Sequence, residues 1–353
     1  MLLTLDRPKR IVPGVGPANP LIVGVGEAPG AHEIAQLKPF VGPAGVVLEQ
    51  CLHAAGLIRS EVYLTNVIKE RPGANSNEIS PFFNGKTFSQ AGHEYVLSLY
   101  EEINALNPNI LVAFGKTAMA ALTGDTRITK LRGYVLEPVA GITSCKKVIP
   151  TIHPAASLYD RKGGDKGSLT TKEFKPYLYR LVIACDLKKA KVESELHELQ
   201  RPDRQLVYQF GSVEEVMEWL AYFEQQPRVC FDIEVTNYEI SCIGFSSNPN
   251  LACTIPLSGR WTEWEELQIW RGIQRVLGNP NSVKIGQNLI FDTHFLLTRC
   301  NIRVRGPIED TMIAHSVMYP ELPMGLGFMG SVYCGAQEYW KDAMDFKNIK
   351  GNS

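Results

Sequence analysis

Four short loops in the first half of the chain hold residues whose types could bind and cleave a small polar ligand. Each follows or ends an apolar run rich in β-formers; the loops are GEAPG (26–30), TNVIK (65–69), FGKTA (114–118) and IHPA (152–155). They contribute a carboxylate, an amide and an imidazole, from Glu27, Asn66 and His153. Ligands of open parallel sheets bind beyond the carboxyl ends of the strands, where such loops converge. We therefore expect one binding site at that edge.

A pair of acidic residues marks a second site in the other half of the chain. In the strand-like run VCFDIEV, the two-residue period places Asp232 and Glu234 on one face. Neighbouring carboxylates repel one another unless a cation lies between them, and carboxylate oxygens are ligands that Mg²⁺ prefers. The later run GQNLIFDTHFL adds Asn288 and Asp292. The pattern predicts a divalent-metal site.

Alternating strands and helices must position the four loops. The apolar runs at 21–25, 62–64, 110–114 and 147–151 are separated by segments with helical periodicity. This alternation predicts an α/β sandwich with a mainly parallel sheet.

A charged segment, residues 191–205, is nearly free of large apolar side chains and predicts a linker between two domains, 1–190 and 206–353. After it, three strand-like runs precede a helix at 262–278, a strand and a further helix. That order predicts a mixed α/β domain.

Charge divides the same way. Residues 1–190 hold 22 Lys and Arg against 16 Asp and Glu, a balance of +6, whereas the rest hold 14 against 21, a balance of −7. A basic half suits phosphates and an acidic half suits divalent metal. Eight scattered cysteines without a CxxC pair predict reduced thiols and a cytoplasmic location. No run is apolar enough for a membrane span, and the first residues do not form a secretory signal.

The string GEAPGAHEIAQLKPFVGPAG, followed by TNVIKERP and IHPA, resembles the uracil-DNA glycosylase superfamily over residues 20–190. It is most similar to the branch, family 4, whose members carry GEAPG, PFVGxAG, TNVVK and HPS or HPA in this order. The resemblance implies a parallel-sheet α/β/α fold and hydrolysis of the bond between uracil and deoxyribose. Such enzymes rotate the base out of the helix and hold it by stacking and hydrogen bonds.

The resemblance also implies roles for four residues. Phe40 would stack on the base, Asn66 would pair with uracil O4 and N3–H, and His153 would donate to O2 of the departing base. Glu27 would orient the attacking water or stabilise an oxocarbenium-like sugar. The alternatives are a core phenylalanine at Phe40 and a turn residue at Asn66.

DNA contacts are expected around the same loops. Backbone amides at Gly26 and Gly30 could grip phosphates, and Leu158 is a candidate wedge for the space left by the base, or else a core leucine. Basic residues near the loops, each of which could instead be a solvated surface charge, are Lys69, Arg71, Lys130, Arg132, Arg161 and Lys162.

Two departures from the resembled branch stand out. That branch holds a four-cysteine iron–sulfur cluster, but residues 1–20 here contain no cysteine and Glu70 follows TNVIK. We therefore predict no cluster, and no cofactor for this domain. In the best-known glycosylase branch the catalytic aspartate lies where this chain has Ala28, and the branch resembled here shows the same shift.

The acidic motifs resemble DEDD-type 3′–5′ exonucleases, which have a ribonuclease H-like fold and use Mg²⁺ or Mn²⁺, with Asp232, Glu234 and Asp292 as metal ligands. The run from EDTM to LGF resembles family A DNA polymerases of the phage type, which implies a bacterial or phage-infected cell. Asp310 is expected to cap a helix. The family's last YxxxD motif is missing, because Ala343 stands four places after Tyr339. We therefore expect an incomplete exonuclease in the N-terminal piece of a longer polymerase, which would be its partner.

Two hypotheses follow for a chain that acts on single- or double-stranded DNA. The first is uracil excision coupled to proofreading in a replicative polymerase. The second is a module that binds DNA or uracil without cutting, in service of the polymerase. A nicotinamide or flavin enzyme is set aside, because GVGEAPG lacks the third glycine of GxGxxG.

Overall fold

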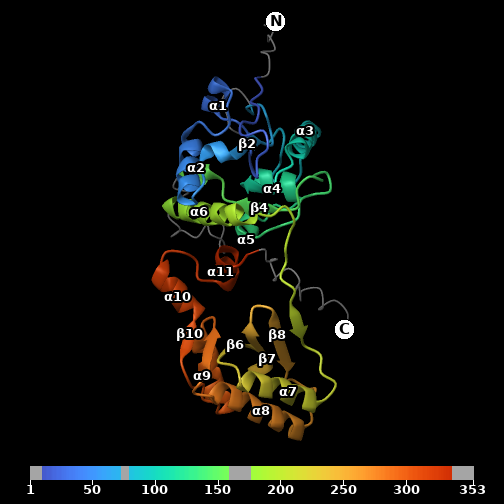
Figure 1. Ribbon diagram of the computed structural model, residues 1–353, viewed down its shortest axis with the longest axis vertical. Coiled ribbons are helices and arrows are strands. Elements are labelled where there is room, and N and C mark those ends of the chain that lie inside the picture. The colour runs from blue at the N-terminus through green and yellow to red at the C-terminus, as the bar shows by residue number, and fades with distance from the viewer. Residues whose placement is uncertain (1–9, 73–78, 159–175, 336–353) are drawn as a thin grey trace. The chain divides into compact units, whose positions relative to one another are not determined.

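The computed structural model describes residues 10–72, 79–158 and 176–335. These residues form two compact units (Figure 1). The first contains the chain up to Arg201 together with the segment from Gly327, and the second contains Pro202–Leu326. The chain therefore leaves the first unit and later returns to it.

A four-stranded parallel sheet in the order β2-β1-β3-β4 forms the centre of the first unit. Its strands are β1 (Ile22–Gly26), β2 (Val62–Asn66), β3 (Ile110–Phe114) and β4 (Val148–Thr151). The register pairs Gly26 with Asn66 and Phe114 with Thr151, so all four strands end at the same edge. That edge carries the four loops singled out in the sequence.

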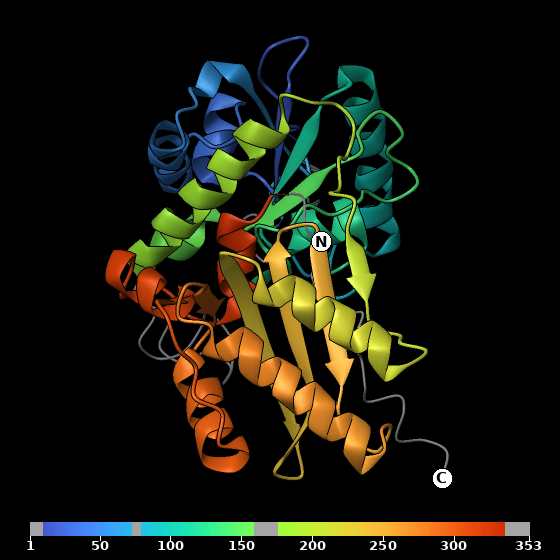
Figure 2. The ribbon, with the colours of Figure 1, turned by 60° about the horizontal axis from the view of Figure 1, so that its bottom comes forward.

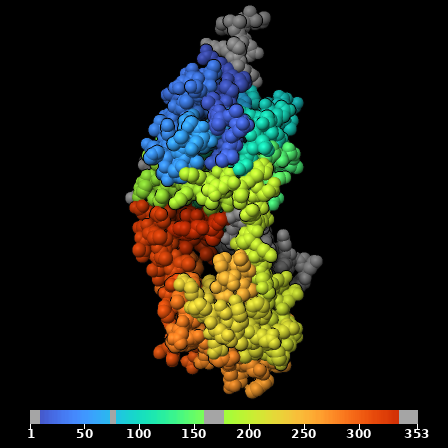
Figure 3. All heavy atoms as spheres, in the orientation of Figure 1, coloured from blue at the N-terminus to red at the C-terminus, as the bar shows by residue number. Residues whose placement is uncertain are grey.

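Helices cover both faces of this sheet (Figure 2). One face packs against α3 (Gln90–Leu106) and α4 (Lys116–Thr123) through a core that includes Val23, Val25, Leu99 and Met119. The other carries α2 (Pro43–Ala54) and α6 (Pro176–Glu193), and Figure 3 shows α6 on the outside of this unit. Shorter elements are α1 (Ala31–Gln36), α5 (Ile128–Leu131), α11 (Leu326–Tyr333) and the 3-10 helices η1 (Arg59–Glu61) and η2 (Pro154–Leu158). This is an α/β/α sandwich.

A six-stranded mixed sheet in the order β10-β9-β6-β7-β8-β5 forms the second unit. Its strands are β5 (Gln205–Val207), β6 (Arg228–Thr236), β7 (Glu239–Asn248), β8 (Leu251–Pro256), β9 (Val283–Gly286) and β10 (Ile308–Asp310). Strands β6, β7 and β8 are antiparallel, and the remaining pairings are parallel. The helices are α7 (Val213–Glu224), α8 (Glu263–Gly278), α9 (Leu289–Cys300) and α10 (Thr311–Met318). A capping box between Thr262 and Glu265 fixes the start of α8.

The predicted fold class is confirmed, and strands lie at every predicted run of the first half. Three differences have physical reasons. Helix α6 extends to Glu193, into the predicted linker, because its last turns are rich in the helix formers Lys and Ala. Strands β5 and β10 are three residues long, too short for a periodic signal. The segment from Gly327 packs with the first unit, which no local pattern indicates.

Within the described part of the chain, no helix has the length and apolar character that a membrane crossing requires.

Candidate active site

The end of β1 brings two of the predicted site residues together. A Cβ atom built on Gly26 would lie 2.3 Å from Oδ1 of Asn66 and 2.6 Å from Cζ of Phe40. Only a glycine permits this approach. The loop after β2 is held beside β1, because Val67 N donates to Gly26 O at 2.9 Å. Asn66 and Phe40 are 4% and 6% exposed, so this contact is almost closed to solvent.

Phe40 lies in a strained loop that other residues hold in place. Its backbone has a φ of 53°, in the left-handed region that non-glycine residues seldom adopt. The Arg59 guanidinium donates to Phe40 O at 2.8 Å and to Pro39 O at 2.6 Å. Gly45 permits the same turn, since a Cβ there would lie 2.0 Å from Phe40 O. Strain kept by so many contacts points to a fixed functional position for this ring.

Glu33 is a site residue that the sequence reasoning missed. Its carboxylate accepts hydrogen bonds from the amides of Gly30 at 3.1 Å, Val41 at 3.1 Å and Gly42 at 2.8 Å. It is 8% exposed and joins the GEAPG loop to the loop that carries Phe40. An acid three residues after Gly30, in the first turn of α1, is a recognisable capping signal, but the two amides beyond α1 are visible only in the fold.

His153 follows β4 and lies beside Phe40. The two ring centroids are 6.1 Å apart and the planes are 29° from parallel. Burial lowers the pKa of His153 to about 4, and the Glu33 carboxylate opposes this shift. The Ala155 amide donates to Nδ1 at 3.2 Å. The imidazole is therefore neutral at physiological pH with its proton on Nε2, which leaves Nε2–H as a donor.

Glu27 is oriented by a residue from the third loop. The Thr117 hydroxyl donates to Oε2 of Glu27, and Thr117 itself is 2% exposed. Glu27 is half-buried, and its carbonyl accepts from Ile68 N at 3.0 Å. The FGKTA loop was expected to contribute to this edge, but no residue in it was assigned a role. Thr117 supplies one: it fixes the direction of the carboxylate.

Two of the expected DNA contacts need correction. Lys69 is 8% exposed, and its ammonium pairs with Glu102 and with the Thr65 hydroxyl, so its charge is neutralised inside the protein. The Gly30 amide already donates to Glu33. Neither group is available to a phosphate.

The other expected DNA contacts have mixed surroundings. Gly26 is buried, and its place is explained by packing. Arg71 is half-buried, and its Nε has no hydrogen-bond partner among the described residues. Leu158 is half-buried at the end of η2, and Lys130 is exposed. Arg132 is neither a surface charge nor a DNA contact, because it is 1% exposed and paired with Asp186. Arg161 and Lys162 lie outside the described residues.

Side chains occupy the position where the resembled branch has a cluster cysteine. Glu70 hydrogen-bonds Tyr95, and burial together with this carboxylate raises the pKa of Tyr95 to about 12. The ring of Tyr95 packs edge-on against Phe82, with centroids 5.6 Å apart. Within residues 10–72, 79–158 and 176–335, no three His, Cys, Asp or Glu side chains are grouped as metal ligands. The residues present do not fit a four-thiolate cluster.

The acidic residues of the second unit lie as the strand period predicts. Asp232 and Glu234 are exposed on β6, while Phe231 and Ile233 point into the core. Asp292, on α9, is 3% exposed and accepts from Ile233 N at 3.1 Å. Partial burial, then Asp292 and Glu234, raise the pKa of Asp232 to about 6. The carboxylates repel one another, but within the described residues they do not form a closed set of three ligands.

Asp310 caps a helix, as predicted, and in fact caps two. It accepts from Met312 N at 2.8 Å at the start of α10, and from Leu289 N at 2.7 Å and Asn288 N at 3.1 Å at the start of α9. Asn288 itself is the left-handed N-cap of α9, with a φ of 59°. The predicted mismatch at Tyr339 and Ala343 lies outside the described residues.

Comparison with known proteins gives two matches along the chain. The sequence pattern of the Uracil DNA glycosylase superfamily matches residues 13–181, and that of a 3′-5′ exonuclease family matches residues 210–352. The chain is 37% identical to the type-4 uracil-DNA glycosylase of Thermotoga maritima over 153 residues, which is 43% of this chain and 73% of the relative. It is 39% identical to that of Archaeoglobus fulgidus, over 42% of this chain and 72% of the relative.

A third relative spans both units. The chain is 24% identical over 337 residues to the DNA polymerase of Bacillus phage SP01, which is 87% of this chain and 33% of the polymerase. The chain therefore spans a third of the length of that relative.

Proposed function

Because the chain belongs to the uracil-DNA glycosylase superfamily and also matches a 3′–5′ exonuclease family, we propose that its first unit hydrolyses the N-glycosidic bond of uracil in DNA. The observation that carries the proposal is the meeting of Phe40, Asn66 and His153 at the carboxyl edge of the sheet. These residues offer an aromatic stacking surface, an amide with both a hydrogen-bond donor and an acceptor, and a neutral imidazole donor.

Each group has a distinct task in the proposed reaction. A uracil rotated out of the helix stacks on Phe40, and the Asn66 amide pairs with its O4 and N3–H, which cytosine's amino group would mismatch. As the bond breaks, negative charge develops on the base, and His153 Nε2–H donates to O2. The imidazole acts in this step as a neutral donor, because its pKa of about 4 keeps it uncharged at neutral pH.

Glu27 acts on the other side of the scissile bond. Held by Thr117, its carboxylate accepts a proton from the attacking water or steadies the positive charge that develops on the sugar. The Thr117 bond is to Oε2, so we assign the proton transfer to Oε1 of Glu27.

The test is a gel assay for abasic sites on an oligonucleotide that contains one uracil. We expect the wild-type chain to produce abasic sites, and His153→Ala to lower the rate by about 10²–10³-fold, the usual cost of removing one donor to a developing anion. His53→Ala, which removes an exposed histidine of α2, is the matched control and should change nothing.

The binding-only hypothesis gives a different result in the same assay. A folded wild-type chain that releases no base, yet retains uracil-containing DNA, would support a non-catalytic module. Loss of base release in His153→Ala with unchanged DNA affinity would exclude it.

The mutual repulsion of Asp232, Glu234 and Asp292 supports a second function for the other unit, as part of a 3′–5′ exonuclease site that takes Mg²⁺ or Mn²⁺. The chemistry of these oxygen donors suits such ions, and the same three residues would hold them. The match to a phage polymerase across both units supports a role in DNA replication and repair. Release of 3′ nucleotides from single-stranded DNA, abolished by Asp232→Asn, is the corresponding test.

A further inference from the structure

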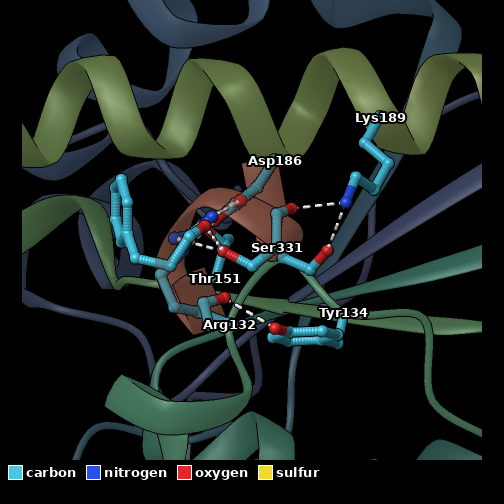
Figure 4. A network of polar contacts seen from close by, with 9 residues as sticks. Arg132, Tyr134, Thr151, Asp186, Lys189 and Ser331 are labelled. Carbon is cyan, nitrogen blue, oxygen red and sulfur yellow. Dashed lines mark hydrogen bonds and ion pairs between the residues drawn. The ribbon is translucent and has the colours of Figure 1, made fainter. Parts of the chain in front are cut away.

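Helix α11 is assigned differently by sequence and by packing. It lies within residues 210–352, which match the exonuclease family, yet from Gly327 it belongs to the first unit. Its hydrogen-bond partners there are Arg132 at the C-cap of α5, Tyr134 just after it, and Lys189 of α6 (Figure 4). The polar groups of α11 contact a region that the glycosylase chemistry does not use.

A buried ion pair lies under the helix. The side chains of Arg132 and Asp186 are 1% and 0% exposed. Arg132 Nε donates to Asp186 Oδ2 at 3.0 Å, Nη2 donates to Oδ1, and Nη1 donates to the Ser331 hydroxyl at 3.0 Å. The Thr151 hydroxyl, at the end of β4, donates to Asp186 Oδ2 at 2.6 Å. Ser331 thus accepts from the guanidinium Nη1 of a buried cation.

The backbone of α11 approaches closely at one glycine. Gly133 has a φ of 74°, and a Cβ there would lie 2.6 Å from Asp186 Oδ1 and 2.9 Å from Ser331 O. Lys189 donates to Gly133 O at 2.8 Å and to Ser331 O, so one ammonium joins the helix to the loop beneath it. A cation at the carbonyl end of a helix is favourable there.

Two further contacts fix the start of the helix. The Tyr134 hydroxyl donates to Gly327 O at 2.6 Å, and the Phe328 ring lies 5.0 Å from the Arg132 guanidinium. Burial lowers the pKa of Lys189 to about 8, despite the attraction of Asp186. Charges buried this deeply are costly unless each is paired and hydrogen-bonded. The hydrogen bonds from Arg132, Tyr134 and Lys189 therefore hold α11 against the first unit.

We propose that α11 is the closing helix of the first unit, an intramolecular partner that seals the Arg132–Asp186 ion pair. The second unit is then an insertion between two parts of the first, and not a domain attached after it. Because Thr151 lies two residues before His153, α11 also steadies the strand end from which His153 projects.

A matched pair of serine substitutions in the full chain tests this. Ser331→Ala removes the acceptor for Arg132 and a helix-internal bond to Phe328 O at 2.6 Å. Ser316→Ala, in α10, removes the same kind of internal bond, to Ile313 O at 2.8 Å, without any buried charge. Hydrogen exchange read by mass spectrometry follows both variants, and it needs no uracil and no catalysis.

We expect Ser331→Ala to speed amide exchange in residues 128–136 and 148–153 by about 10-fold, because a buried charged donor loses its acceptor. Residues 205–310 should exchange as in the wild type, and Ser316→Ala should leave both regions of the first unit unchanged. Faster exchange confined to α11 itself, with residues 128–136 and 148–153 unaffected, would overturn the proposal.

Tyr134→Phe provides a milder variant should Ser331→Ala fail to fold. It removes only the hydroxyl that donates to Gly327 O, and we expect a smaller acceleration in the same residues. If Ser331→Ala is unfolded and Tyr134→Phe exchanges as the wild type does in residues 128–136 and 148–153, Ser331 matters for another reason. That result would also contradict the proposal.

Discussion

Burial favours the neutral side chain at both candidate sites of this chain, but the charges around the two sites differ. In the first unit, burial lowers the pKa of His153 and so keeps the imidazole neutral, with each ring nitrogen's role fixed. In the second unit, burial and neighbouring acids raise the pKa of Asp232, because like charges face one another. The first site is electrostatically complete before a ligand arrives, whereas the second needs a counter-charge. A pKa shift therefore indicates whether a site needs an opposite charge from a ligand, as well as where the site lies.

After His153→Ala, the next largest effect is expected from removing the amide that would pair with the base. Asn66→Ala should lower uracil excision by about 100-fold, since it deletes the polar groups that would pair with uracil and leaves the stacking ring. Single-turnover rates on a uracil-containing oligonucleotide measure this. Asn19→Ala, which alters an exposed asparagine of the same unit, is the control. An Asn66→Ala rate close to that of the wild type would assign Asn66 to the turn alone.

Glu33→Gln should disturb the hydrogen bonds that hold the first site in place. We expect it to lower activity less than Asn66→Ala does. The amide nitrogen of Gln cannot accept a hydrogen bond, so at least one of the three backbone amides loses its partner. We expect kcat to fall by about 10-fold, the equivalent of one such bond, with less change in KM. Glu101→Gln, on the exposed surface of α3, should leave both constants unchanged. An effect on KM alone would indicate that Glu33 only shapes binding.

The neutral state of His153 gives a pH prediction with a definite sign. Its folded pKa of about 4 lies below the ordinary value of 6.5, so the unfolded chain binds more protons between these values. The stability contribution is therefore present above pH 6.5 and is lost as pH falls toward 4. Urea unfolding from pH 7 to pH 4 should show a steeper loss in the wild type than in His153→Gln. Equal slopes would place His153 in solvent.

The smallest effect is expected for the charge repulsion in the second site. Without metal, Asp232→Asn should raise the melting temperature of the second unit by a few degrees, because it removes one of the facing charges. Mg²⁺ should raise the wild-type melting temperature and affect Asp232→Asn less. Glu239→Gln, at an exposed position at the start of β7, controls for a general loss of negative charge. An identical response of all three proteins to Mg²⁺ would contradict metal binding at Asp232.

Sequence reasoning reached the features that local patterns encode. Apolar runs located the strands of the first sheet, and parallel order then placed Asn66 and His153 at one edge. Strand period placed Asp232 and Glu234 on one face of β6. Each of these inferences needs only neighbouring residues and a general rule about sheets.

What it missed depends on residues far apart in the chain. In the sequence, Lys69 is a basic residue in a loop that is predicted to contact DNA. In the fold, its ammonium pairs with Glu102. Arg132 and Ser331 are separated by 199 positions, and neither carries a local signal. Thr117 lies 90 positions from Glu27. A charge or hydroxyl in a sequence does not reveal whether its partner is a phosphate, water or another side chain.

The discontinuous first unit has a consequence for how the protein is made. A ribosome releases the strands of the first sheet early, but α11 emerges only after all of residues 202–326. During that interval Arg132 lacks the acceptor that the Ser331 hydroxyl provides, and domains generally fold as units in the order in which they are made. A ribosomal pause within residues 202–326 therefore leaves the first unit without α11 for as long as the pause lasts.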